Sequence, residues 1–207
     1  MDATQERSNV AGLEALALRQ SGYFDRGDAL AHHLSDRALS YHVQTGRFER
    51  VFPGVFRLRN APYSPHDDLW RAWVWTNYRG AIARESALAF YGLSDVMPSQ
   101  VQLTAPPAFN RRVPAEFAVQ RARLTRDDLT VRDGIAVTTP ARSIIDAAAA
   151  GADPAQIQRA VHEALQRGLV AVADLRSEAN RSRYRHSYNV RRQIAAAIRS
   201  ASVHATT

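Results

Sequence analysis

The sequence predicts an α+β protein with two domains, and three observations lead to this fold class. Short amphipathic segments with helix-capping residues occupy the first 46 positions, and two strand-forming runs around a Pro-Gly pair follow them directly. After a proline-containing break, helical and strand-like segments alternate, and an arginine-rich helical segment follows them. A length of 207 residues suits one domain or two small ones.

Three short helices are expected before the Pro-Gly pair. Apolar residues recur at helical spacing in 10–22, which predicts the first helix. Asp25 is expected to cap a short second helix, and Ser35 to cap a third helix over 36–46. The third helix leads directly into the strand-forming runs.

The stretch RFERVFPGVFRL, residues 47–58, predicts a two-stranded hairpin around its Pro-Gly turn. If Phe52 pairs with Val55 across the turn, then Arg50 lies opposite Arg57, on a face that presents arginines. Three helices followed by such a hairpin make a winged helix-turn-helix. In that DNA-binding unit, the third helix enters the major groove and the hairpin lies along the DNA backbone.

The candidate DNA contacts are the polar face of the third helix and the arginines of the hairpin. An exposed helix of any globular protein has a similar face, so the assignment depends on the helix and the hairpin together. Residues 1–62 carry eight arginines against seven acidic residues, so dimerisation or another basic segment must support binding to phosphates. The residues expected to contact DNA are Arg37, Ser40, Tyr41, Gln44, Arg47, Arg50, Arg57 and Arg59.

The break NAPYSPHDD is the predicted domain boundary, because two prolines flank an otherwise polar segment. We therefore expect a winged helix-turn-helix domain at 1–62 and a second domain at 63–207. Within the second domain, 63–170 should form a mixed α/β core, since LTVRDGIAVT contains an Asp-Gly hairpin signal. Residues 171–207 should form an arginine-rich helical tail.

The net charge of +7 is distributed unevenly along the chain. After Gly151, nine arginines face four acidic residues, and most of this excess lies in 176–199. Arginines interleaved with tyrosines are typical of a nucleic-acid contact or of a surface for an acidic partner; a solvated helix is the alternative. The arginines in question are Arg181, Arg183, Arg185, Arg191 and Arg192.

The composition excludes several kinds of chemistry. The chain has no cysteine, so disulfides and thiolate-ligated metals are excluded, which suits a reducing compartment. All 27 basic residues are arginine, which excludes mechanisms that need a lysine amine, including that of ordinary protein kinases. No apolar run approaches the ~18 residues of a membrane span, and we expect a soluble, cytoplasmic protein with no membrane partner.

Candidate metal and acid-base residues are few. His162 and Glu163 begin the pattern of a zinc metalloprotease helix, but Gln166 stands where the second histidine is needed. Asp67 and Asp68 could hold a magnesium ion, although acids in the first turn of a helix also favour the helix dipole. We therefore predict no metal site and no cofactor.

Several stretches together resemble the AbiEi-type antitoxins of type IV toxin-antitoxin systems. The matching stretches are GYFDRGDAL, LSDRALSYHVQTGRFERVFPGVFRL, ARESALAFYGLSDVMPSQVQLT, RARLTRDDLTVRDGIAVTTPARSIIDAAAAG and AVHEALQRGL. Together they cover residues 21–170, and the third and fourth stretches are specific in order and spacing.

The resemblance implies an antitoxin that represses its own operon at inverted repeats and neutralises an AbiEii-type nucleotidyltransferase toxin. Its partners would be operator DNA and that toxin, without a stable complex being required. The arginines of the basic segment are then candidate contacts to the toxin or to RNA. One alternative is an atypical serine/threonine protein kinase that uses ATP and magnesium on the toxin, with Asp67 and Asp68 as weak catalytic candidates. A plain transcriptional regulator is another.

Overall fold

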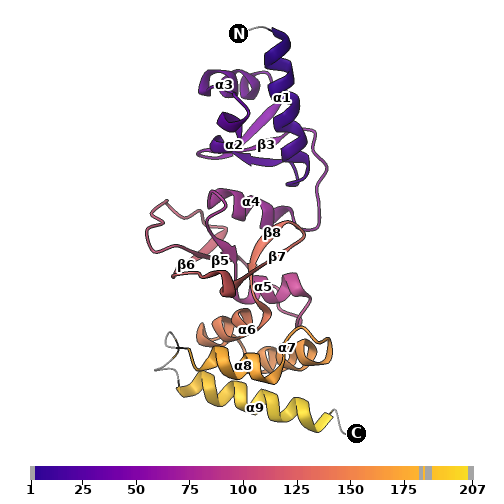
Figure 1. Ribbon diagram of the computed structural model, residues 1–207, viewed down its shortest axis with the longest axis vertical. Helices are drawn as coiled ribbons and strands as arrows, with labels where there is room; N and C mark the ends of the chain where they lie inside the picture. Colours follow the sequence, from indigo (N-terminus) through magenta and orange to yellow (C-terminus); the bar gives the residue numbers. More distant parts are fainter. Residues whose placement is uncertain (1–2, 182–183, 185–187, 205–207) are drawn as a thin grey trace. The chain divides into compact units, whose positions relative to one another are not determined.

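The computed structural model describes residues 3–181, 184 and 188–204. The chain forms two compact units, Met1–Gly80 and Ala81–Thr207 (Figure 1). Among the helices of the described residues, none combines the length and the apolarity that a bilayer crossing requires.

The first unit is a winged helix-turn-helix with one additional helix, which confirms the predicted fold. Its elements, in chain order, are α1 (Ala3–Leu18), β1 (Tyr23–Asp25), α2 (Arg26–Ala31), α3 (Asp36–Gln44), β2 (Phe48–Phe52), β3 (Val55–Leu58) and α4 (Asp67–Trp75). The three strands form an antiparallel sheet in the order β1-β3-β2. The hairpin β2–β3 is the wing.

Side-chain caps fix the starts of α2 and α3, as the sequence predicted. Asp25 accepts a hydrogen bond from the backbone N–H of Asp28, and the Asp28 carboxylate accepts one from the N–H of Asp25. Ser35 Oγ accepts from the N–H of Ala38 at 3.2 Å. Such caps satisfy backbone donors that the first helical turn leaves without partners.

The core of this unit is built around aromatic rings from the three strands. The Phe24 ring centroid lies 5.1 Å from that of Phe48 and 5.5 Å from that of Phe56. Leu13 of α1 and Leu39 of α3 pack into the same cluster. β1 was not predicted, because a strand of three residues leaves too short a pattern to detect.

The register of the wing differs from the prediction in the half that lies away from the turn. Phe52 pairs with Val55 as expected, but a bulge between Arg50 and Phe52 shifts the remaining pairs, so Arg50 lies opposite Phe56 rather than Arg57. One extra residue exchanges the two faces of a strand, because side chains alternate with a period of two. The bulge thus places Arg50 on the face that carries Phe56. Arg57 lies on the other face of β3, opposite the core residues Phe56 and Leu58, but the segment 61–67 covers that face, so the predicted exposure of Arg57 was wrong.

Arg57 is held inside the first unit with only 3% of its surface exposed. Its guanidinium donates to the carbonyls of Leu58, Ala61 and Pro62 at 3.3, 3.0 and 3.2 Å. The carboxylate of Asp67 lies 3.8 Å away and supplies the opposite charge. A buried guanidinium must have such partners, since an isolated charge is costly to remove from water.

The same contacts explain why the compact unit extends to Gly80, beyond the boundary predicted after residue 62. Asp67, in the first turn of α4, accepts a hydrogen bond of 2.7 Å from the hydroxyl of Tyr23. The hydroxyl of Tyr78 donates to the Asp28 carboxylate. Burial and this hydrogen bond raise the pKa of Tyr78. The helix after the proline-containing break thus packs with the helices and strands that precede it.

The second unit is a mixed α/β fold, as predicted. Its elements are β4 (Ala81–Ile82), α5 (Arg84–Tyr91), β5 (Val101–Ala105), β6 (Phe117–Arg121), the 3-10 helix η1 (Arg126–Asp128), β7 (Leu129–Arg132), β8 (Ile135–Thr138), α6 (Pro140–Ala149), α7 (Pro154–Gln166), α8 (Val172–Ala179) and α9 (Tyr188–His204). The strand order is β6-β5-β4-β8-β7. In Figure 1, α6 packs against α5, α7 and α8, and α9 covers α7 and α8.

A charge network connects distant segments of this unit. It consists of the buried residues Asp128, Arg142, Asp146 and Tyr184 and the half-buried Arg181. Arg142 is 1% exposed, and its guanidinium lies 3.0 Å from Asp128 and 2.7 Å from Asp146. Arg181 pairs with Asp128, and the hydroxyl of Tyr184 donates to Asp146. The network joins η1, α6 and the segment after α8.

We expect Arg57→Ala to lower the free energy of unfolding of the first unit by about 3 kcal/mol, because three carbonyls and one carboxylate lose their partner. Urea denaturation followed by tryptophan fluorescence measures this unit selectively, since the chain's 3 tryptophans all lie in α4. Arg59→Ala, at an exposed neighbouring position, is the control and should change the value by less than about 0.5 kcal/mol. An equal decrease in the free energy of unfolding in both variants would contradict the structural role of Arg57.

The network makes the second unit sensitive to acid. Burial opposes ionisation of Asp128, but the hydrogen bonds from Thr125 and Arg181 and the charge of Arg142 outweigh this effect and lower the pKa of Asp128. A carboxyl group whose pKa is lower in the folded protein than in the unfolded chain stabilises the fold at pH values above its unfolded pKa. This stabilisation is lost as the pH falls through the pKa of the folded state.

We therefore expect Asp128→Asn to destabilise the second unit near neutral pH and to flatten the decline in melting temperature below about pH 4. Calorimetric unfolding at a series of pH values measures both effects. The exposed Asp133→Asn serves as the control. An acid-side decline as steep in Asp128→Asn as in the wild type would show that other groups cause it.

Candidate nucleic-acid interface and adjoining surfaces

The polar face of α3 is exposed, as a recognition helix requires. Leu39 faces the core, whereas Arg37, Tyr41 and Gln44 point outward, with Tyr41 59% exposed. Ser40 is also exposed, although its hydroxyl donates to the carbonyl of Asp36 at 2.8 Å. These side chains include a guanidinium, an amide and two hydroxyls, which can bond to base edges and to phosphates.

The wing presents two arginines beside this helix. Arg50 is exposed, with its guanidinium carbon 5.9 Å from the centroid of the Phe56 ring. Arg59 is exposed and donates to the carbonyl of Gly46 at 2.8 Å, which directs its side chain toward the end of α3. Of the eight predicted DNA contacts, seven lie at the surface and Arg57 does not.

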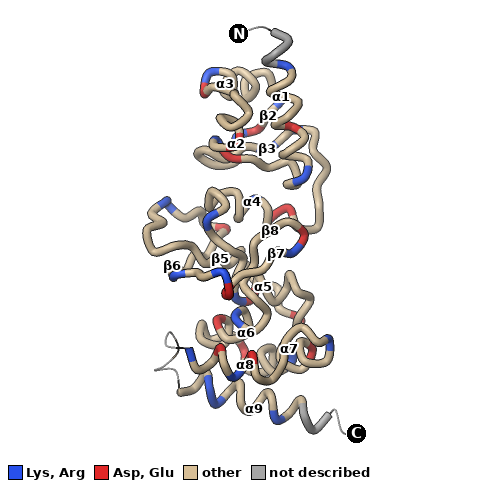
Figure 2. Tube along the Cα trace, viewed as in Figure 1, with Lys and Arg blue, Asp and Glu red and all other residues tan. Residues whose placement is uncertain are grey.

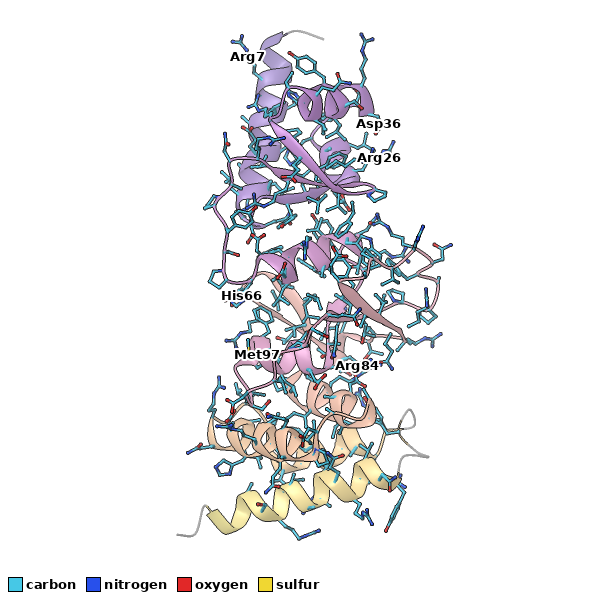
Figure 3. All side chains as sticks on the ribbon, turned by 180° about the vertical axis from the view of Figure 1, so that it is seen from behind. Arg7, Arg26, Asp36, His66, Arg84 and Met97 are labelled. Carbon is cyan, nitrogen blue, oxygen red and sulfur yellow. The ribbon has the colours of Figure 1, made fainter. Side chains whose placement is uncertain are left out.

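Ion pairs within the first unit neutralise part of its positive charge. Arg26 donates to both carboxylate oxygens of Asp36 at 2.7 Å, and Figure 3 shows the two side chains together. The hydrogen bond from Arg26 lowers the pKa of Asp36. Arg47 binds Glu14 through two hydrogen bonds of 2.7 and 3.0 Å. Among the described residues, Arg37, Arg50 and Arg59 have no such carboxylate partner.

The predicted basic segment divides into structurally different parts. Arg181 belongs to the charge network around Arg142, since it pairs with Asp128; it also lies 3.3 Å from Glu178. Arg183 and Arg185 lie outside the described residues. Arg191 and Arg192 lie on α9, where Figure 2 shows arginines and no acidic residue.

A groove of about 350 Å³ between α8 and α9 gathers further arginines. Arg191 lines it together with Arg176 and Arg199, which were not predicted, and Ile194 and Ile198 form part of its apolar wall. The sequence of 176–199 could have indicated that these arginines lie together, because the spacing of Arg191 and Arg199 lets both line one side of α9.

The two first-turn acids of α4 have structural partners. Asp67 accepts from Tyr23 and neighbours Arg57, whereas Asp68 is exposed and pairs with Arg71 at 2.8 Å. Within the described part of the chain, no group of three or more potential metal-ligating side chains could hold an ion.

A cavity of about 550 Å³ opens in the second unit between η1, α6 and α8. Sequence reasoning did not find this cavity, because its lining comes from segments separated along the chain. Its polar lining residues are Tyr91, Asp127, Thr130, Thr139, Asp174, Ser177, Glu178 and Arg181. Burial raises the pKa of Glu178, against the lowering effect of the nearby Arg181 charge.

Comparisons with known proteins identify both units. Residues 13–59 match the family described as "Transcriptional regulator, AbiEi antitoxin", and residues 80–193, more than half of the chain, match "AbiEi antitoxin C-terminal domain". The crystal structure of the RV2827C protein from Mycobacterium tuberculosis has a similar fold. It has a TM-score of 0.59 at 13% sequence identity, over 94% of this chain and 77% of that one. No curated protein matches the sequence.

The regulator domain coincides with the winged helix-turn-helix, and the antitoxin domain with the mixed α/β unit. The chain is thus an antitoxin with DNA-binding regulation. It belongs to the AbiEi family of antitoxins.

Proposed function

We propose that this antitoxin represses its own operon through α3 and the wing, and neutralises a nucleotidyltransferase toxin through its second unit. The observation that carries the first part is the exposed polar face of α3 beside Arg50 and Arg59, two wing arginines without carboxylate partners among the described residues. In a winged helix-turn-helix, the third helix contacts bases and the hairpin contacts phosphates.

The chemistry of the α3 face supports this assignment of roles. Gln44 can bond bidentately to adenine, and Arg37 to guanine or to a phosphate. The internal ion pairs leave few phosphate contacts per copy, so one copy should bind DNA weakly. Two copies at inverted repeats would double these contacts, which is the arrangement that autorepression at an operator requires.

We expect the double change Arg50→Ala with Arg59→Ala to weaken operator binding by at least about tenfold, because two phosphate contacts are lost. The slope of log affinity against log salt should become shallower by about 2 for each copy bound. Gel shift or fluorescence anisotropy over a series of salt concentrations measures both quantities.

Arg79→Ala is a suitable control, since Arg79 is exposed in the same unit but lies outside α3 and the wing. If the control and the double variant bind operator DNA equally well, the wing does not contact DNA. A loss of affinity with an unchanged salt slope would also contradict phosphate contacts by these arginines.

Neutralisation is proposed for the second unit because residues 80–193 match the antitoxin C-terminal domain. The nucleotidyltransferase identity of the toxin comes from the family resemblance. Phosphorylation of the toxin has weaker support, since Asp67 and Asp68 are engaged by structural partners.

We expect co-expression of this chain to restore growth of cells that produce its cognate nucleotidyltransferase toxin. The Arg50→Ala, Arg59→Ala variant should restore growth equally well, because its changes affect only the DNA-binding unit. The intact mass of the toxin, recovered from the same cells, should be unchanged. Absence of rescue by the wild-type chain would leave a transcriptional regulator without antitoxin activity, and an added phosphate would favour the kinase alternative.

A further inference from the structure

One side of α9 is basic and carries an exposed aromatic ring. Tyr188, Arg191, Arg192 and Arg199 lie on this side, because positions three, four and seven apart share a helical face. A helix that is merely solvated gains from opposite charges three or four residues apart, but α9 contains no acidic residue with which to form such a pair. Among the described residues, Arg192 and Arg199 have no carboxylate partner, so their charges are available to an external anion.

The groove between α8 and α9 brings an arginine of α8 to the same surface. Arg176 is exposed and lines the groove together with Arg191 and Arg199, and no acidic residue occurs in the described part of the lining. Arg191 and Arg199 are eight residues apart, which is about 12 Å along the helix axis. Guanidinium groups at this separation can bind different phosphates of one chain, each with two hydrogen bonds.

A second groove of about 350 Å³ lies between α9 and α7. Arg192 lines it beside the side-chain amides of Gln158, Asn189 and Gln193, and its described lining also lacks a carboxylate. Side-chain amides form hydrogen bonds with base edges and with ribose hydroxyls. The two grooves beside α9 therefore offer hydrogen-bond donors to phosphates, sugars and bases.

Tyr188 indicates which form of nucleic acid suits this surface. Its side chain is 66% exposed in the first turn of α9. An aromatic ring among arginines can stack on a base, but only an unpaired base has a free face. A duplex meets a protein mainly through its phosphates and base edges. The exposed ring therefore favours a single strand over duplex DNA.

An amide in the first groove favours RNA over single-stranded DNA. Asn180 is exposed at the end of α8 and lines the groove with the arginines. The 2′-hydroxyl of ribose both donates and accepts hydrogen bonds, and a side-chain amide can serve it in either role. Deoxyribose lacks this group.

We propose that this surface, the α9 face, binds single-stranded RNA. The α9 face consists of Tyr188, Arg191, Arg192 and Arg199 of α9 and of Arg176 across the groove. The arginines bind phosphates, and Tyr188 stacks on one base. This activity is separate from repression through α3 and the wing, and it requires no contact with the toxin.

Fluorescence anisotropy of a labelled oligouridylate with the full chain tests the proposal. Arg176→Ala with Arg199→Ala removes two exposed arginines and should weaken RNA binding at least about tenfold. The slope of log affinity against log salt should become shallower by about 1.4, the value for two phosphate contacts to a single strand. Arg123→Ala with Arg126→Ala is the matched control, because it removes the same charge from exposed positions of the same unit that line neither groove. Equal RNA affinities of the two double variants would overturn the proposal.

Substitutions of Tyr188 separate stacking from charge. Tyr188→Phe keeps the ring and should bind the oligouridylate as the wild type does. Tyr188→Ala should lower the affinity at least about fivefold, because the base loses its stacking partner, and should leave the salt slope unchanged. Equal affinities of Tyr188→Phe and Tyr188→Ala would show that no base stacks there, and the single-strand assignment would fail.

Measurements with other ligands distinguish RNA from the other possible occupants. The oligodeoxyuridylate of the same length should bind more weakly than the oligouridylate, because it lacks the 2′-hydroxyl. The Arg176→Ala, Arg199→Ala variant should bind operator DNA as the wild type does, whereas the Arg50→Ala, Arg59→Ala variant should retain its affinity for the oligouridylate. Equal binding of the two oligonucleotides, or an equal loss of operator and RNA affinity in the Arg176→Ala, Arg199→Ala variant, would overturn the assignment to RNA. A loss of growth rescue in that variant with unchanged RNA affinity would assign the α9 face to the toxin instead.

Discussion

The burial of one guanidinium in each unit is the constraint on which the rest of the structure depends. Arg57 is surrounded by backbone carbonyls and Asp67, and Arg142 lies between Asp128 and Asp146. Burial of a charge is tolerated only where opposite charges and hydrogen bonds compensate it. Each arginine therefore fixes the positions of several segments at once: the wing and α4 in one unit, and η1 and α6 in the other.

In the first unit, contacts between residues close in the sequence could be predicted, whereas the burial of Arg57 could not. Caps such as Asp25 and Ser35 are local, because donor and acceptor lie within one turn, and the sequence was sufficient to predict them. The burial of Arg57 depends on the segment that follows the wing, because the partners of its guanidinium include the carbonyls of Ala61 and Pro62 and the carboxylate of Asp67. A strand pattern indicates two faces, but the segments that pack on each face decide which one is buried.

The candidate sites also divide into residues that local sequence predicts and residues that depend on distant segments. Exposed residues of α3 were predictable, since helical spacing alone defines its polar face. The role of Arg181 was not, because its partner Asp128 is buried in a segment far away along the chain. The cavity between η1, α6 and α8 could not be predicted either, since Asp127 and Glu178 line the same space only after η1 and α8 have packed. Charge composition thus overstates the arginines available to partners, because part of the charge is used within the fold.

The bulge in the wing also bears on how such a protein can change during evolution. Because one inserted residue reverses the alternation of β2 relative to β3, the surface of the wing is governed by chain length as well as by residue type. Loss of a single codon at the bulge would exchange the inner and outer faces of half the hairpin without altering any arginine. A deletion in β2 would therefore change the exposed surface of the wing more abruptly than a single substitution does.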